Sequence, residues 1–318
     1  MFRGVIYLAC LFVCLSPLRA LIIEPGNPPV NLGNLDRFSS FPNNITSNPG
    51  FLYQQFDWSG VGWRNNSAAI SVSLISDQYI IGASHVATAP NANVTFQDSS
   101  GILRTYTVET VTVLQTGVLD AGIQTFFTTE LNQPGFTYQN SDLYIAKLTE
   151  TVHQDVARYN YGTGSAIGQR VLMYGVGKDV GQQTIDGGTF VEATLNNNTF
   201  LTDTLTSTYE ANASDRLRYD SRFVNGDSSS PTFANVDGEL VLLGVHSAIS
   251  NNNGTFTNFD NDVAAYADQI NTIISGDGDT FESTELIPGN QIVPEPATAG
   301  LLALAGLGLA WRRRQRRC

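Results

Sequence analysis

The stretch that decides the fold and the function is Gly226-Asp227-Ser228-Ser229-Ser230-Pro231. Its glycine permits backbone conformations that other residues resist, and Pro231 fixes the exit from the turn. Such a turn has the local geometry of an acyl-transfer site, in which Ser228 would be the nucleophile and the N–H groups of Gly226 and Ser228 would receive the charge on the substrate oxygen. The stretch therefore predicts a histidine and an acid elsewhere in the chain. An ordinary surface turn is the alternative interpretation.

A histidine and an acid precede this stretch in suitable positions. The chain reads Ile80-Ile81-Gly82-Ala83-Ser84-His85-Val86, an apolar strand pattern that runs into His85. Asp142 comes directly before an alternating apolar segment, where a buried carboxylate can hold an imidazole in one tautomer and stabilise its charged form. Each residue alone is explained by a structural histidine or a turn residue. Their occurrence together with Ser228 favours a catalytic site, in the order His, Asp, Ser.

Short segments with β-strand patterning occupy the chain from Phe56 onward. Clusters of Gly, Asn, Asp and Ser separate them. The predicted strands include residues 69–75, 79–81, 106–108, 111–114, 171–174 and 239–245. Helical spacing of apolar residues occurs near the end of this region, from Val263 to Ile274. We therefore predict an all-β body that ends in one helix.

These segments resemble the trypsin-like (chymotrypsin-fold) serine proteases. Ile81 to Val86 is similar to the family's TAAHV segment, Asp142 to Leu148 to its DIALLKL strand, and Gly226 to Pro231 to its GDSGGP loop. The resemblance covers residues 56–275. It includes three weaker matches, to the VAGWG strand, the GIVS strand and the terminal helix, at residues 171–177, 243–247 and 259–274.

The resemblance implies two antiparallel six-stranded β-barrels and a C-terminal helix, with the site between the barrels. It implies His85 as general base, Asp142 as the acid that orients it and Ser228 as nucleophile. The N–H groups of Gly226 and Ser228 would form the oxyanion hole, and Asp227 would be a structural acid behind the loop. The implied activity is a secreted serine endopeptidase that acts on protein or peptide substrates through an acyl-enzyme, without a cofactor or metal.

The loop departs from the family pattern in one respect. Ser229 and Ser230 replace two glycines, and their side chains could press on the turn that forms the oxyanion hole. No basic residue followed by Ile-Val-Gly-Gly precedes the first strand, so activation by a new N-terminus has no support in the sequence. A catalytically inactive homologue that binds at an extracellular surface or matrix is the alternative function.

Three residues are predicted to bind substrate, namely Arg222, His246 and Ser247. In the resemblance, Arg222 lies at the floor of the primary specificity pocket and His246 lines it. Both side chains can be cationic, which predicts a preference for an acidic residue before the cleaved bond. The alternatives are that Phe223 fills the pocket, that Arg222 pairs with one of the many acids, and that His246 is a histidine at the edge of the core with Arg222 a surface cation.

The N-terminal region divides into two predicted segments. Residues 1–20 are a signal peptide, because the apolar run Val5 to Leu15 follows Arg3 and precedes the small residue Ala20. Residues 21–55 are rich in Pro, Asn and Gly and predict an irregular arm or pro-segment.

The C-terminal region carries a second targeting pattern. Residues 276–292 form an acidic linker, whose carboxylates at Asp277, Asp279 and Glu282 allow calcium binding but favour a solvated spacer. Residues 293–318 begin with Val-Pro-Glu-Pro, continue with an apolar segment at 297–311 and finish with an arginine-rich stretch at 312–317 before Cys318. This order resembles the PEP-CTERM sorting tail, which implies removal by an exosortase-type enzyme and delivery to the outer surface. A simple transmembrane anchor is the alternative.

Charge and cysteine content exclude several classes of function. The net charge is −12, and seven of the 17 basic residues are arginines in the two end segments, so the body between them is more acidic still. Nucleic acids and anionic membranes are therefore disfavoured as partners. The three cysteines, Cys10, Cys14 and Cys318, lie in the end segments. The body consequently has no disulfide and no thiol-based metal site.

Overall fold

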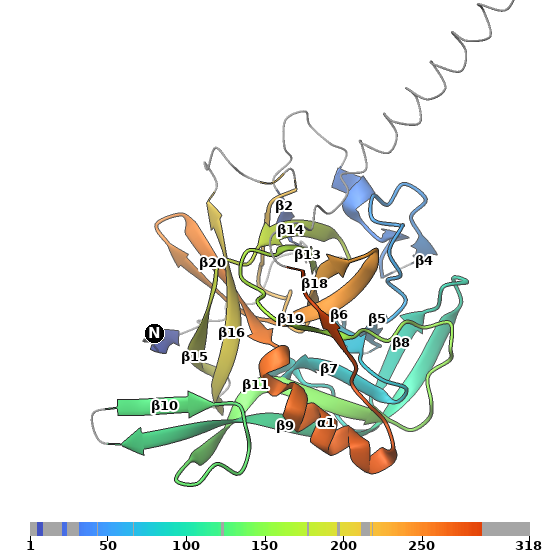
Figure 1. The fold of residues 1–318 in the computed structure, drawn as a ribbon. Coiled ribbons are helices and arrows are strands. Elements are labelled where there is room, and N and C mark those ends of the chain that lie inside the picture. Colours follow the sequence, from blue (N-terminus) through green and yellow to red (C-terminus); the bar gives the residue numbers. More distant parts are fainter. Residues whose placement is uncertain are drawn as a thin grey trace, which may run out of the picture.

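In the computed structural model the described residues form a β-sheet protein (Figure 1), and they include one α-helix, near the end of the described chain. The described residues are 5–8, 21–23 and 32–287, apart from 43, 66, 122–123, 177, 196–197, 211–216 and 218. The prediction of an all-β fold of two barrels with a C-terminal helix is confirmed.

The first barrel is a closed ring of six antiparallel strands. Its order is β9-β11-β7-β6-β5-β8, and pairing between β8 and β9 closes the ring. The strands are β5 (Val61–Arg64), β6 (Ser67–Leu74), β7 (Tyr79–Ala83), β8 (Asn93–Gln97), β9 (Leu103–Ala121) and β11 (Thr137–Leu148), with β10 (Gln124–Thr128) paired to the far end of β9. Alternation of apolar and polar residues places Val72, Ile80 and Ala146 in the buried interior of this barrel.

The second barrel belongs to a larger sheet. Its antiparallel strands follow the order β15-β16-β20-β19-β18-β13-β14. They are β13 (Arg170–Tyr174), β14 (Val180–Thr184), β15 (Gly187–Leu195), β16 (Asn198–Glu210), β18 (Pro231–Val236), β19 (Glu239–Asn252) and β20 (Thr255–Asp262). Three short strands join this sheet in parallel, β1 (Val5–Leu8), β12 (Tyr161–Thr163) and β21 (Ser283–Glu285).

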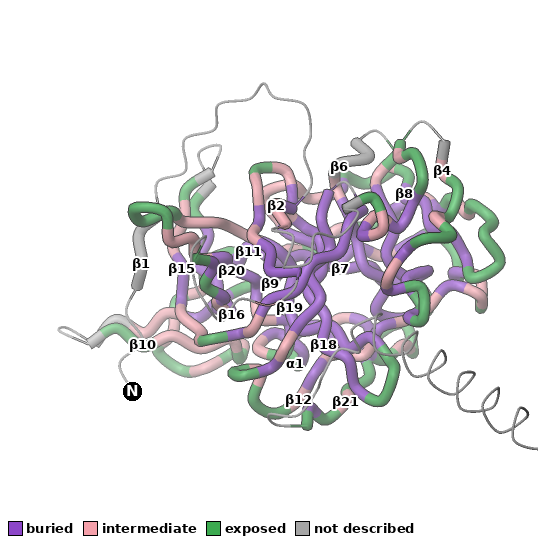
Figure 2. Tube along the Cα trace, turned by 90° about the horizontal axis from the view of Figure 1, so that it is seen from above, coloured by how far each residue is buried: buried purple, intermediate pink, exposed green. Residues whose placement is uncertain are grey.

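A hydrophobic core lies between the two barrels. It contains Ile81 and Leu143 from the first barrel and Leu172 and Phe233 from the second. In Figure 2 the tube is buried along β7, β18 and most of the first half of β19, while the outer loops are exposed. The 3-10 turn η3 (Ala264–Tyr266) and helix α1 (Ala267–Ile274) cover this core with buried Tyr266 and Ile270. Because this core is shared, the relative position of the barrels is set by packing as well as by the chain connection.

The N-terminal arm is more ordered than its sequence predicts. It contains η1 (Leu32–Leu35), β3 (Phe38–Ser40) and β4 (Asn44–Ser47), and β2 (Ile22–Ile23) pairs with β17 (Ser221–Arg222). Leu35 and Tyr53 are fully buried in the core between the barrels. Residues 32–55 therefore belong to the folded body rather than to a separate arm.

The predicted linker also differs from its expectation. After the turn η4 (Ser275–Asp277), Phe281 and Leu286 are buried, and β21 pairs with β12. The carboxylate of Asp277 accepts from Lys147 Nζ at 3.0 Å and from the hydroxyl of Tyr79, both on the first barrel. This segment therefore contacts both barrels. Its apolar side chains Phe281 and Leu286 pack into the core between the barrels and into the core of the second barrel. The folded body extends to about Ile287.

A truncation pair tests this boundary. We expect a chain that ends at Ser275 to lose at least about 4 kcal/mol in the free energy of unfolding, because it lacks the buried side chains of Phe281 and Leu286. A chain that ends at Gln291 should unfold like the complete body. Denaturant titration of the two chains measures the difference. Equal stabilities of the two truncated chains would show that residues 276–291 are a solvated linker.

Two targeting predictions fall mainly outside the described residues. The predicted signal peptide contributes only β1 to them, and the predicted sorting tail at 293–318 contributes nothing. Among the helices that the structure describes, none has the length and apolar character needed to span a bilayer.

Candidate active site

His85 lies where the first barrel meets the second. Strand β7 ends at Ala83, and the single turn η2 (Ser84–Val86) carries His85 away from the sheet. The imidazole is nearly buried, with 3% of its side chain exposed. A short turn after a buried strand therefore fixes the ring at the edge of the barrel.

Asp142 lies opposite this ring on β11. The pairing of β11 with β9 changes register between Asn140 and Tyr144, which marks a β-bulge around Asp142. Both carboxylate oxygens of Asp142 lie 2.9 Å from His85 Nδ1, and one also accepts the backbone N–H of His85 at 2.9 Å. Bulges reorient side chains next to active sites. The structure thus brings together the histidine and the acid that the sequence predicts.

Three further side chains fix Asp142. Ser247 Oγ donates to its second oxygen at 2.6 Å, and Ser84 Oγ donates to the first at 3.2 Å. Asn261 Nδ2 donates to the backbone carbonyl of Asp142 at 2.7 Å. Sequence analysis assigned Ser247 to substrate binding and did not identify Ser84 or Asn261. No local pattern could have identified Asn261 or the role of Ser247, because their contacts join β20 and a register shift in β19 to the first barrel, whereas Ser84 directly precedes His85 in the sequence.

Ser228 lies in the loop between β17 and β18, residues 223–230, which we call the Ser228 loop. Its side chain is half-buried, and within the described residues it makes no hydrogen bond to His85. The backbone N–H groups of Gly226 and Ser228 likewise donate to no described protein group. Both N–H groups are therefore available to an incoming oxygen atom, as an oxyanion hole requires.

The buried side chain of Asp227 holds the Ser228 loop in place through hydrogen bonds. Its carboxylate accepts the N–H groups of Val176 at 2.9 Å and Val224 at 2.7 Å. Burial raises the pKa of Asp227 to about 7, while the nearby ammonium group of Lys178 favours the ionised form. Lys178 is itself fully buried, which lowers its pKa to about 7. Asp227 thus has the structural position behind the loop that the resemblance implies.

The predicted specificity residues do not form a cationic pair. His246 is 1% exposed, and its ring centroid lies 3.5 Å from that of Phe223. Burial lowers the pKa of His246 well below its usual range, so the ring is neutral at pH 7. Arg222 lies with its guanidinium 3.7 Å from the ring centroid of Phe256. The structure therefore provides no pair of charges for an acidic substrate side chain, because Phe223 covers His246.

His246 lies in a group of three buried polar side chains, with Thr232 and Asp260. Thr232 Oγ1 lies 3.0 Å from His246 Nε2 and donates to Asp260 Oδ1 at 3.0 Å. Burial raises the pKa of Asp260 to about 8, although the bond from Thr232 opposes the shift. Asp260 is therefore protonated at neutral pH.

Asp260 predicts a pH dependence of stability. Between about pH 4 and about pH 8, Asp260 is protonated in the folded chain and ionised in the unfolded chain. The contribution of Asp260 to the free energy of unfolding therefore falls as the pH rises, by about 1.4 kcal/mol per pH unit. Asp260→Asn should remove this dependence. Denaturant titrations of both chains between about pH 5 and about pH 8 measure it. A constant difference between them would contradict the protonated state.

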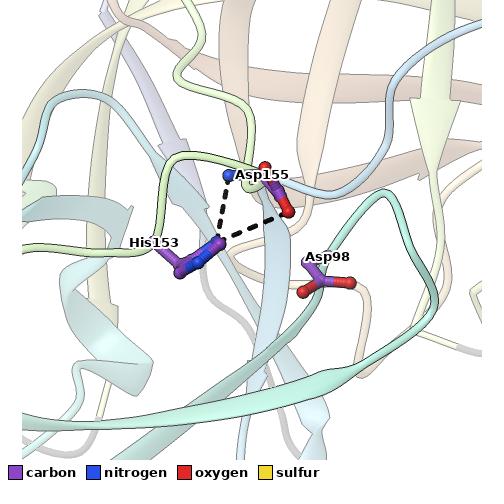
Figure 3. A group of neighbouring side chains, drawn as sticks. All are labelled: Asp98, His153 and Asp155. Carbon is purple, nitrogen blue, oxygen red and sulfur yellow. Dashed lines mark hydrogen bonds and ion pairs between the residues drawn. The ribbon is translucent and has the colours of Figure 1, made fainter.

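A second group of polar side chains has the composition of a metal site. Figure 3 shows Asp98 on the turn after β8 facing His153 and Asp155 on one loop. However, Asp98 Oδ2 accepts from Arg104 Nε at 2.6 Å, and its Oδ1 accepts the N–H groups of Ser100 and Ile102. A metal ion would compete with the guanidinium for this carboxylate. We assign no metal to the group.

The fold and the paired His85 and Asp142 define the class of two-barrel serine proteases. The sequence model of the family described as Trypsin matches residues 53–270, and that of the PEP-CTERM protein-sorting motif matches residues 293–314. The chain therefore belongs to the trypsin family and carries a PEP-CTERM sorting motif. A comparison with curated proteins gives no match.

Solved structures of serine proteases share low sequence identity with the chain. The MamO protease domain of Magnetospirillum magneticum is 15% identical, with a TM-score of 0.39, over 69% of this chain and 95% of that one. Cellulomonas bogoriensis chymotrypsin is 14% identical, with a TM-score of 0.40, over 72% and 100%. Mouse neuropsin is 14% identical, with a TM-score of 0.38, over 68% and 94%.

Proposed function

We propose that the chain is an exported serine endopeptidase that uses His85, Asp142 and Ser228 as its catalytic triad. The observation that carries this proposal is the contact of His85 Nδ1 with both oxygens of Asp142 at 2.9 Å. A carboxylate in this position keeps the proton on Nδ1, so Nε2 is the basic nitrogen. Membership of the trypsin family supplies the reaction class.

The proposed reaction proceeds through an acyl-enzyme. Ser228 Oγ attacks the carbonyl carbon of the peptide bond while His85 Nε2 takes the hydroxyl proton, and the N–H groups of Gly226 and Ser228 receive the oxyanion. His85 then returns the proton to the leaving amine as the C–N bond breaks. A water molecule attacks the ester in the same way and releases the acid. Asp142 stays ionised and stabilises the charged imidazole in each step.

The alternative function is an inactive homologue that binds at the cell surface. One observation favours it, namely the missing hydrogen bond between Ser228 and His85 within the described part of the chain. Catalytic hydrogen bonds are often long without substrate and shorten in the reacting complex. The backbone N–H groups of Gly226 and Ser228, which donate to no group among the described residues, support the enzyme over the inactive homologue.

Labelling with a fluorophosphonate probe tests the proposed function. The probe reacts with a serine hydroxyl only when a base and an oxyanion hole activate it, so peptide mapping should find the label on Ser228. Ser228→Ala should abolish labelling, and the exposed Ser100→Ala should keep it. A folded protein without label on Ser228 would establish the inactive homologue.

The sorting motif supports a proposal about location. We infer that the chain is exported by its N-terminal signal, that an exosortase-type enzyme recognises residues 293–318, and that the protease domain acts at or outside the cell surface. The motif match supports this route. Protein or peptide substrates outside the cell are the partners that it implies.

A further inference from the structure

The two serines that follow Ser228 make hydrogen bonds across the boundary between the barrels. Ser229 and Ser230 are buried, with 1% and 0% of their surface exposed. Ser229 Oγ accepts the backbone N–H of Ala83 at 3.0 Å, and Ser230 Oγ donates to Ser71 Oγ at 3.2 Å. Both serines belong to the Ser228 loop of the second barrel, whereas Ala83 and Ser71 lie on β7 and β6 of the first.

The partners of the two serines lie at the place where β6 and β7 stop pairing. The ladder between these strands ends at Ser73 opposite Ile81. If the same register continued, Ser71 would face Ala83. One of the two serines bonds to each of these residues, so the Ser228 loop occupies the open end of the β6–β7 pair.

The backbone at Ser229 indicates that its hydroxyl has a specific role. Its φ is 72°, in the left-handed region that disfavours residues with a side chain. Glycine would adopt this conformation at lower cost, so the hydroxyl must offset the difference. Gly82 leaves the necessary space, because a Cβ at that position would lie 2.4 Å from Ser229 Oγ.

A buried lysine fixes the second contact. Lys178 Nζ donates to Ser71 Oγ at 2.8 Å, so this oxygen accepts from both Lys178 and Ser230. Lys178 belongs to the turn between β13 and β14, and Val176 of that turn donates to Asp227. The same turn therefore supports the Ser228 loop at Asp227 and, through Ser71, at Ser230.

We propose that Ser229 and Ser230 are positioning residues, which hold the Ser228 loop in the open end of the β6–β7 pair and so set Ser228 against His85. Ser229 adjoins the nucleophile, and its partner Ala83 lies two residues before the general base. This inference rests on the proposed function. The sequence suggests that the two side chains press on the turn; their hydrogen bonds give them a supporting role instead.

The inference predicts a specific kinetic change. Catalytic groups on different barrels must be aligned within about 0.5 Å, and a misalignment lowers the rate of reaction more than the binding of substrate. Ser229→Gly restores the usual family residue and relieves the backbone, but it removes the hydroxyl and leaves the N–H of Ala83 without its partner. We expect kcat and the rate of fluorophosphonate labelling to fall about tenfold, with KM nearly unchanged.

The experiment compares Ser229→Gly and Ser230→Ala with wild type and with the control Ser100→Ala. Labelling rate, kcat and KM are measured on each chain, with thermal unfolding and amide hydrogen exchange at Ala83. Faster exchange at Ala83 together with slower labelling in Ser229→Gly supports the proposal. Labelling as fast as in wild type, in either folded variant, overturns it for that residue. If Ser229→Gly does not fold, Ser230→Ala alone decides.

The results also separate this inference from the proposed function. Wild type that is never labelled refutes the enzyme, and the positioning role falls with it. Wild type that is labelled, beside variants labelled equally fast, refutes only the positioning role. A matched loss of kcat and rise of KM would indicate general disruption of the site and would also contradict it.

Discussion

Ser228→Ala is expected to lower kcat by a factor on the order of 10⁶ while the chain stays folded. The hydroxyl supplies the proposed nucleophile, and the half-buried side chain makes no hydrogen bond within the described residues that folding would lose. Hydrolysis of a casein or peptide substrate measures the rate, and circular dichroism with thermal unfolding measures the fold.

His85→Ala serves as the matched variant for this prediction. Members of a triad act as a unit, so its loss should equal that of Ser228→Ala, and the double variant should be no slower than either single one. An intact rate in Ser228→Ala would remove Ser228 from the mechanism. Additive losses in the double variant would show that His85 acts independently of Ser228.

Local sequence patterns predicted the strands because their apolar residues face either a barrel interior or the core between the barrels. Ile80 and Ile81 illustrate this, since one faces the interior of the first barrel and the other the core between the barrels. The strand that leads into His85 and the position of Asp142 at an apolar strand were also predicted from local sequence. The contact between His85 and Asp142 was an expectation from family resemblance, and the structure supplies its geometry.

The structure differs from the expectations for residues 21–55 and 276–292, because the buried side chains in these segments follow no regular spacing. Phe281 is buried between two polar neighbours, and the buried Phe51 and Tyr53 lie in an apolar stretch too short to show a helix or strand period. Pattern analysis needs several apolar residues at regular spacing to identify an element. Contacts that depend on tertiary packing, such as that between β12 and β21, leave no such signal.

The surroundings of individual side chains were also beyond sequence reasoning. His246 and Arg222 were expected to form a cationic pair, yet burial makes His246 neutral, and the charged guanidinium of Arg222 packs against Phe256. The hydrogen bonds of Ser247 and Asn261 to Asp142 arise because β19 and β20 of the second barrel approach β11 of the first. The sequence carries no local signal for this approach.

Asp142→Asn is expected to lower kcat by about 10⁴ with little effect on folding. The carboxylate accepts the backbone N–H of His85, its Nδ1–H and the hydroxyls of Ser84 and Ser247. An amide has only one acceptor oxygen. If that oxygen keeps the backbone N–H, the amide nitrogen faces Nδ1 and donates to it, which moves the ring proton to Nε2. The imidazole then cannot take the proton of Ser228.

Ser247→Ala is the matched control for Asp142→Asn, because it removes one donor to the same carboxylate and leaves the tautomer of His85 unchanged. We expect it to cost less than about tenfold in kcat, as the loss of one hydrogen bond does. The rates of both variants and the ring nitrogen shifts of His85 by NMR provide the test. A proton on Nε2 in Asp142→Asn together with a rate near that of wild type would show that Asp142 does not act through the tautomer. A loss in Ser247→Ala as large as that in Asp142→Asn would instead assign the effect to the position of the carboxylate.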